Sequence, residues 1–122
     1  MITGIHALLY SSQAELVRAF LRDVLGWSHV ASGEGWLIFA MPPAEVAVHP
    51  TEGAPSTELY LMCDDVEATV EELRAKGVEF EGDIQDQGWG RVTSIRLPDG
   101  SSLGLYQPQH PTAIALGAGA GG

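Results

Sequence analysis

The stretch CDDVEATVEELRAKGVEF, from Cys63 to Phe80, carries the clearest folding signal in the chain. Asp64 followed three residues later by Glu67 has the spacing of a helix-capping pair, which satisfies free N–H groups at a helix start. The apolar residues that follow recur at helical spacing and form one buried face: Val66, Val70 and Leu73. Gly77 suits the left-handed conformation that ends a helix. The sequence therefore predicts a helix over residues 64–77.

Strands are predicted on both sides of this helix. TELYLMC (residues 57–63) precedes it, and three segments follow it: VEFEGDI (78–84), GRVTSIRL (90–97) and SLGLYQP (102–108). These segments are rich in strand-forming residues and are separated by glycine or proline. PDGSS (98–102) predicts a tight turn between the last two. Residues 57–108 are thus expected to follow the order β-α-β-β-β.

The first part of the chain shows the same order. GIHALLYSS (4–12) predicts a strand, and SSQAELVRAFLRDVLGW (11–27) predicts a helix that Ser12 and Glu15 cap and Gly26 ends. WSHVAS (27–32), GWLIFAM (35–41) and EVAVHP (45–50) predict three more strands, with turns at 32–35 and 42–44. The N-terminal part is therefore expected to be a second copy of the same unit.

A repeat of this kind indicates an internal duplication. Superposing the two halves places His6 opposite Glu58 and Ala47 opposite Gly104. We expect one domain over residues 1–108, with module one at 1–50, a linker at 51–56 and module two at 57–108. Residues 109–122, which include the Gly-rich end AIALGAGAGG, are expected to be a flexible tail.

Composition limits the classes of function. The 122 residues include 16 Asp and Glu but only 6 Lys and Arg, a formal net charge of −10, so a phosphate-binding surface for nucleic acid is not expected. This acidic charge either favours cationic ligands over anionic ones or serves solubility alone. No window approaches the roughly 20 apolar residues of a membrane span. Cys63 is the one cysteine, and the N-terminus lacks a signal-peptide pattern, so we expect a cytoplasmic protein.

Three segments resemble the vicinal oxygen chelate superfamily: FLRDVLGW (20–27), CDDVEATVEELRAKGVEF (63–80) and RLPDGSSLGLYQP (96–108). This superfamily includes glyoxalase I, extradiol dioxygenases and the bleomycin resistance proteins. The resemblance implies an α+β fold in which two paired βαβββ modules form a curved mixed β-sheet cavity, with the helices outside. It also implies that metal-dependent members place ligands at positions that match His6, Ala47, Glu58 and Gly104 here.

Only two of these four residues carry a donor group. His6 and Glu58 suit Ni, Zn, Fe or Mn, but Ala47 and Gly104 have none to offer, and such sites normally use three or more protein ligands. His49 lies two residues beyond Ala47 and supplies a third ligand only if its strand is shifted. Without a metal, His6 and Glu58 are expected to form a hydrogen-bonded pair or to contact a ligand. No cofactor is therefore expected, with a divalent metal as the alternative.

Strand alternation places several aromatic residues on the predicted cavity face: Tyr10, Tyr60 and Tyr106. Trp89 lies between glycines in QDQGWGR, which predicts an exposed loop and a pocket lid, or else a loop residue without a role. Arg96 is expected to pair with Glu58 or a ligand carboxylate, or to lie in solvent. Trp27 and Trp36 are expected to fill the core.

Three classes of function fit this pattern. The first is a binding protein that captures a small molecule, cationic or aromatic, and works as a homodimer, as the resemblance to the resistance proteins implies. The second is a metal-dependent lyase, isomerase or extradiol-type dioxygenase that uses His6 and Glu58. The third is an accessory domain with a vestigial pocket. The two missing donors favour the first class.

Overall fold

The computed structural model describes residues 6–33 and 36–114 and shows an α+β fold, as predicted. In chain order its elements are α1 (Ala14–Ala19), the π-helical turn η1 (Phe20–Val24), β1 (His29–Ala31), β2 (Leu37–Phe39), β3 (Tyr60–Met62), α2 (Val66–Ala75), β4 (Glu79–Asp86), β5 (Gly90–Arg96) and β6 (Ser102–Pro108). The second half therefore has the predicted order β-α-β-β-β.

Four strands of the second half form one sheet in the order β3-β6-β5-β4. β3 runs parallel to β6, and the other two pairings are antiparallel. A parallel pair needs a long crossover connection, which α2, β4 and β5 supply here. Gly100, at a φ of 87°, takes the left-handed position in the predicted PDGSS turn between β5 and β6. In the β3–β6 register Tyr60 lies opposite Gly104, and this pairing positions the site described below.

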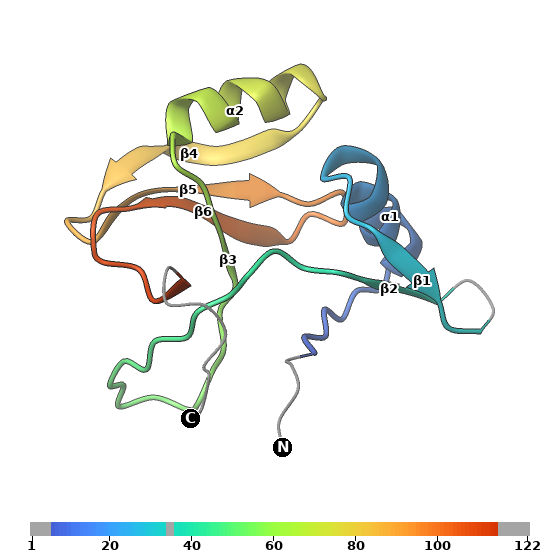
Figure 1. Ribbon diagram of the computed structural model, residues 1–122, viewed down its shortest axis with the longest axis horizontal. Coiled ribbons are helices and arrows are strands. Elements are labelled where there is room, and N and C mark those ends of the chain that lie inside the picture. Colours follow the sequence, from blue (N-terminus) through green and yellow to red (C-terminus); the bar gives the residue numbers. More distant parts are fainter. Residues whose placement is uncertain (1–5, 34–35, 115–122) are drawn as a thin grey trace.

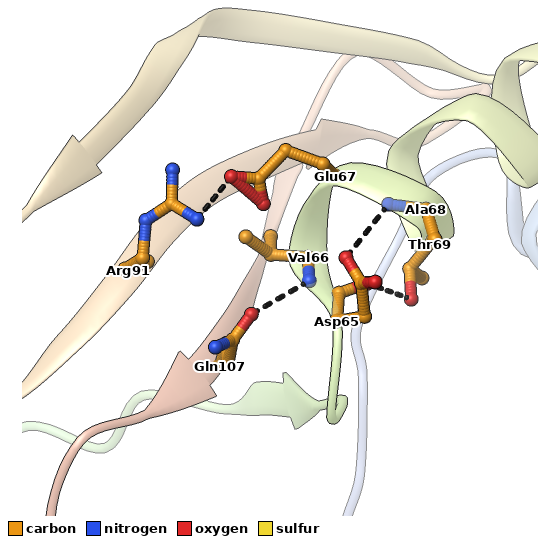
Figure 2. A network of polar contacts seen from close by, with 7 residues as sticks. All are labelled: Asp65, Val66, Glu67, Ala68, Thr69, Arg91 and Gln107. Atoms are coloured by element: carbon orange, nitrogen blue, oxygen red, sulfur yellow. Dashed lines mark hydrogen bonds and ion pairs between the residues drawn. The ribbon is translucent and has the colours of Figure 1, made fainter.

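Figure 2 shows the polar contacts that cap the start of α2 and join it to the sheet. The Asp65 side chain accepts a hydrogen bond from the Ala68 backbone N–H at 3.1 Å and so caps the helix. The predicted cap, Asp64, is wrong by one residue. The Val66 N–H donates to the Gln107 side chain on β6 at 3.0 Å, and Arg91 on β5 forms an ion pair with Glu67. The start of α2 is thus tied to two strands.

The core lies between α2 and the four-stranded sheet (Figure 1). The predicted helix face is buried there, together with residues from β5, β6 and the turn that joins them: Val66, Val70, Leu73, Ile95, Leu97, Leu103 and Leu105. Phe20 and Leu21 of η1 belong to the same cluster. The first helical segment therefore packs into the core of the second half, at one end of its sheet.

The first half departs from its prediction. β1 and β2 form the expected antiparallel hairpin, and Gly26 takes the left-handed conformation at a φ of 70°. Residues 6–12 and 45–50, however, are not strands, and Gly4 and Ile5 lie outside the described residues. Alternation predicts a strand's conformation but not its hydrogen-bonding partner, and without a partner a strand is not stable. The second copy of the module is thus incomplete in the single chain.

The first helix also begins later than predicted. Its N-cap is Gln13, whose side chain makes no capping hydrogen bond, so the predicted Ser12–Glu15 capping box is wrong. Ser11, one residue earlier, donates from its hydroxyl to Asp99 at 2.5 Å and accepts from the Gln13 N–H at 3.0 Å. These contacts hold the start of the helix against the β5–β6 turn.

Candidate functional site

Three aromatic rings from β3, β6 and the β4–β5 turn meet in one cluster. The ring centroids of Trp89 and Tyr106 lie 5.4 Å apart, those of Tyr60 and Tyr106 5.7 Å, and those of Tyr60 and Trp89 6.2 Å. All three pairs are edge-to-face, the arrangement that the ring quadrupoles favour. Tyr106 is buried, whereas Tyr60 and Trp89 are 40% and 45% exposed. The cluster therefore has a buried base and two partly exposed rings.

Two glycines make room for these rings. A Cβ atom at Gly104 would lie closer than 3.0 Å to three atoms of the Tyr60 ring, and one at Gly90 would lie 2.8 Å from Cδ2 of Tyr106. Real Cβ atoms almost never approach another atom so closely. The rings therefore pack against bare backbone, and Gly104 is a packing residue for Tyr60.

Glu58 adds a negative charge at the exposed side of the cluster. The Tyr60 hydroxyl donates to Oε2 of Glu58 at 2.9 Å. This hydrogen bond, followed by partial burial, raises the pKa of Tyr60 above its usual value, so its phenol stays neutral. An exposed carboxylate beside an aromatic surface is suited to bind a positively charged or hydrogen-bond-donating group.

Trp89 is held in place by its turn. The Gln109 N–H donates to the Trp89 carbonyl at 2.9 Å, and the Gln87 N–H donates to the Gly90 carbonyl at 2.9 Å. Gly88 takes a left-handed φ of 83° and donates its N–H to the Asp86 carboxylate at 2.9 Å. The predicted exposure of Trp89 is confirmed, and these bonds fix the backbone of its turn; a role as a pocket lid stays a prediction.

Two further residues near the cluster were not predicted from the sequence. The His110 ring stacks on Tyr106 with centroids 6.0 Å apart, and its Nε2 lies 3.3 Å from the Tyr106 hydroxyl. Glu45 accepts hydrogen bonds from the N–H groups of Ala113 and Ile114 at 2.8 and 3.2 Å. Burial is the main cause of the raised pKa of Tyr106, and the negative charge of Glu45 raises it further.

A flexible tail was expected from residue 109 onward. Residues 109–114, however, contact the domain. No periodic pattern in that segment indicated these contacts.

A cleft of about 650 Å³ adjoins the cluster. It is lined by three short segments that include Leu8, Glu58, Tyr60 and Gly104. This volume falls in the range of pockets for small organic molecules. The cleft thus lies between the apolar segment 7–9 on one side and Tyr60 and Glu58 on the other.

The structure brings together four of the eight predicted site residues: Glu58, Tyr60, Trp89 and Tyr106. His6, Tyr10 and His49 are exposed, and within the described residues none of them makes a side-chain hydrogen bond or a ring contact. Arg96 is paired with Glu81, Nε to Oε1 at 3.2 Å, and not with Glu58. Trp36, expected in the core, is 65% exposed, with the Arg18 guanidinium 5.1 Å from its ring centroid.

The metal that the family resemblance implies does not fit the residues described. Position 47 carries a methyl group, and the space beside Gly104 is filled by the Tyr60 ring. Over residues 6–33 and 36–114, no group of three or more His, Cys, Asp or Glu side chains is placed to hold a metal ion. A site for an ion such as Zn normally uses at least three protein ligands.

The Cys63 thiol lies next to β6. Burial raises the pKa of the Cys63 thiol, whose Sγ lies 3.6 Å from the Tyr106 carbonyl oxygen. A thiol with a raised pKa is a weak nucleophile at neutral pH. None of the helices in the described ranges is long and apolar enough to cross a membrane.

Comparison with known proteins identifies the family. A model of the glyoxalase/bleomycin resistance protein/dioxygenase superfamily matches residues 5–105, which is most of the chain. The chain belongs to this superfamily. The predicted resemblance is thereby confirmed. A search of the curated proteins found no match.

Solved structures from the superfamily share the fold. TnmS3, an antibiotic-binding protein from Streptomyces sp. CB03234, has 29% sequence identity and a TM-score of 0.64, over 88% of this chain and 98% of its own. A glyoxalase/bleomycin resistance protein from the same organism has 31% identity and a TM-score of 0.54, over 79% and 92%. Lactoylglutathione lyase from Agrobacterium tumefaciens, at 19% identity and a TM-score of 0.62 over 86% and 92%, is similar in fold alone.

Proposed function

We propose that this superfamily member binds a small, planar aromatic molecule that carries a positive charge, without catalysing a reaction on it. The observation that carries the proposal is the cluster of Tyr60, Trp89 and Tyr106 with the Glu58 carboxylate at its exposed side. Exposed aromatic rings bind planar ligands by stacking, and a nearby carboxylate selects for a cationic group.

The electrostatics of the whole chain support a cationic ligand. With a formal net charge of −10, the protein attracts cations and repels anions before they reach the site. The similarity to TnmS3, which is described as an antibiotic-binding protein, supports a role in binding. The absence of donor groups at Ala47 and Gly104 supports binding over the metal-dependent lyase, isomerase or dioxygenase.

The proposal extends to the setting of the site. The domain would cover residues 1–108 in two modules, 1–50 and 57–108, and would act in the cytoplasm as a homodimer. Neither nucleic acid nor a membrane is a proposed partner. Four residues make up the proposed ligand site, namely Glu58, Tyr60, Trp89 and Tyr106.

Two matched three-ring probes test this function. Proflavine is a planar aromatic cation and anthracene-9-carboxylate a planar aromatic anion, and the fluorescence anisotropy of each reports its binding. We expect saturable binding of proflavine and weaker binding of the anion. In Trp89→Ala the affinity for proflavine should fall about tenfold, because one stacking partner is lost. Trp36→Ala is the control, since Trp36 is also exposed but lies outside the cluster.

Two results would overturn the proposal. One is no saturable binding of proflavine at any concentration that leaves the protein folded. The other is an equal loss of affinity in Trp36→Ala and Trp89→Ala, which would place the probe elsewhere on the surface.

A further inference from the structure

Residues 109–114, here called the strap, follow β6 directly and bring a ring to the base of the aromatic cluster. The contacts of Tyr106 with Tyr60 and Trp89 are edge-to-face, with interplanar angles of 80° and 68°. Its contact with His110 is stacked, with an interplanar angle of 27°. Stacking is the arrangement in which a planar ligand contacts an aromatic ring. The strap thus places a ring of its own chain where a stacked ligand ring would lie.

Two polar contacts fix the orientation of the His110 ring. Its Nδ1 lies 2.7 Å from the Pro111 carbonyl oxygen, which can only accept, so Nδ1 carries a proton. In the neutral ring Nε2 is then an acceptor, and the Tyr106 hydroxyl donates to it at 3.3 Å. Both nitrogen atoms of the imidazole are therefore satisfied while the ring lies on Tyr106.

Glu45 holds the far end of the strap. Its Oε1 atom accepts hydrogen bonds from the N–H groups of both Ala113 and Ile114, at 2.8 and 3.2 Å. Glu45 lies 68 residues before Ala113, in a segment that is neither helix nor strand. Hydrogen bonds between such irregular segments open more readily than those of a buried sheet. The strap can therefore be released without breaking the sheet.

The inner side of the strap faces a space and not a packed core. Its half-buried residues, which alternate with exposed ones, are His110, Thr112 and Ile114. They line a cavity of about 500 Å³ whose wall also includes Met62 and Pro108. Packed protein cores hold few voids larger than a water molecule. Release of the strap would therefore break few packing contacts and would open space next to Tyr106.

We propose that the strap is an autoinhibitory contact: the His110 ring closes the aromatic site of the ligand-free protein, and a planar aromatic ligand binds by displacing it. This inference rests on the proposed function, because it names the element that competes with that ligand. The apparent affinity of a site falls with the fraction of molecules in which the site is open. A strap that is closed in about nine of ten molecules weakens binding about tenfold.

Removal of the His110 ring tests the competition, because its effect has the opposite sign to the loss of a binding residue. In His110→Ala, made in the full chain, the affinity for proflavine measured by anisotropy should rise about three- to tenfold. His110→Phe is the matched control. It loses the same ionisable group but keeps a ring that stacks on Tyr106, so its affinity should stay within about twofold of the wild type.

Removal of the Glu45 carboxylate tests the closed state without a ligand. In Glu45→Ala the amides of Ala113 and Ile114 should exchange with solvent about tenfold faster than in the wild type, as followed by NMR. Glu52→Ala is the matched control, because it removes the same charge at an exposed position and should leave this exchange unchanged. In the wild type, saturation with proflavine should also speed the exchange, because the probe displaces the strap.

Three results would overturn the inference. Weaker binding of proflavine in His110→Ala than in the wild type is one, since His110 would then be a wall of the site and the proposed function would stand. The second needs no variant: it is wild-type exchange at Ala113 and Ile114 that is unprotected without ligand, or unchanged at saturation with proflavine. The third is a lack of proflavine binding in the wild type, His110→Ala and Glu45→Ala alike, which would overturn the proposed function as well.

Discussion

The ring of Tyr60 occupies the space that a side chain at position 104 would need. The two residues face each other in the parallel register of β3 and β6, so the ring lies against bare backbone. The family resemblance implies that position 104 corresponds to a metal-ligand position of the family's metal-dependent members. In this chain the position carries a glycine, and its lack of a side chain makes room for an aromatic ring.

Gly104→Ala should therefore destabilise the protein by about 1–3 kcal/mol, because the added methyl group overpacks the site beneath Tyr60. Urea denaturation measures the change. In a Tyr60→Ala background the same substitution should cost clearly less, since the ring that it meets is gone. Gly53→Ala is the control, because its Cβ would meet only a side-chain atom of Thr51 at 3.6 Å. An equal cost of Gly104→Ala in both backgrounds would show that the contact with Tyr60 does not matter.

The hydrogen bond from Tyr60 to Glu58 predicts an alkaline titration. It raises the pKa of Tyr60, so the stability that it contributes is present below the unfolded-state pKa of about 10 and is lost as the pH rises through the folded-state pKa. In Glu58→Ala the titration midpoint of Tyr60 should fall, as followed by phenolate absorbance. Tyr60→Phe identifies which of the three tyrosine signals moves, and Glu52→Ala should leave it in place. An unmoved midpoint in Glu58→Ala would rule out this pairing in solution.

The two neighbouring aspartates before α2 give a direct test of its cap. Asp65→Ala should lower the free energy of unfolding by about 1 kcal/mol, because the Ala68 N–H loses its acceptor. Asp64→Ala should change it by less than about 0.5 kcal/mol. Thermal or urea unfolding of the two variants measures both values. Asp65 is not the helix cap if the two variants are equally destabilised, or if Asp64→Ala is the less stable of the two.

The negative charge of the chain predicts that salt weakens the binding of a cationic probe. The affinity for proflavine should fall as NaCl rises from about 50 to 500 mM, because salt screens the attraction between the acidic protein and the cationic probe. Binding of anthracene-9-carboxylate should not weaken over the same range. Anisotropy titrations at several salt concentrations measure both. Affinity for proflavine that does not depend on salt would leave the charge without a role in binding.

The second half of the fold was predictable because its signals are local. The capped apolar face of α2, the PDGSS turn and the alternating strands all lie within short windows of sequence. The helix start was misplaced by one residue because Asp64 and Asp65 are both good caps, and only the backbone conformation selects between them. The contact between Tyr60 and Tyr106 was predictable for the same reason, since alternation placed both rings on the predicted cavity face.

Segments 6–12 and 45–50 of the first half were mispredicted because a strand depends on a partner that can lie far away in the sequence. Alternating side chains in GIHALLYSS and EVAVHP predicted strands, but over residues 6–33 and 36–114 no sheet includes either segment. The contacts of His110 and Glu45 were also missed, because a single histidine beside a proline and a single glutamate give no periodic signal. Both contacts depend on the path of the chain after residue 109, which places His110 on Tyr106 and residue 113 beside Glu45.

The central claim, that the Tyr60–Trp89–Tyr106 cluster binds a planar aromatic cation, is tested most directly by NMR of the three tryptophan indole N–H groups during a proflavine titration. Trp27 and Trp36 serve as internal references, since neither takes part in the cluster. The Trp89 signal should shift in a saturable way through the ring current of the bound probe, while the other two stay in place. A shift of Trp36 alone, or no shift of Trp89 at saturation, would contradict it.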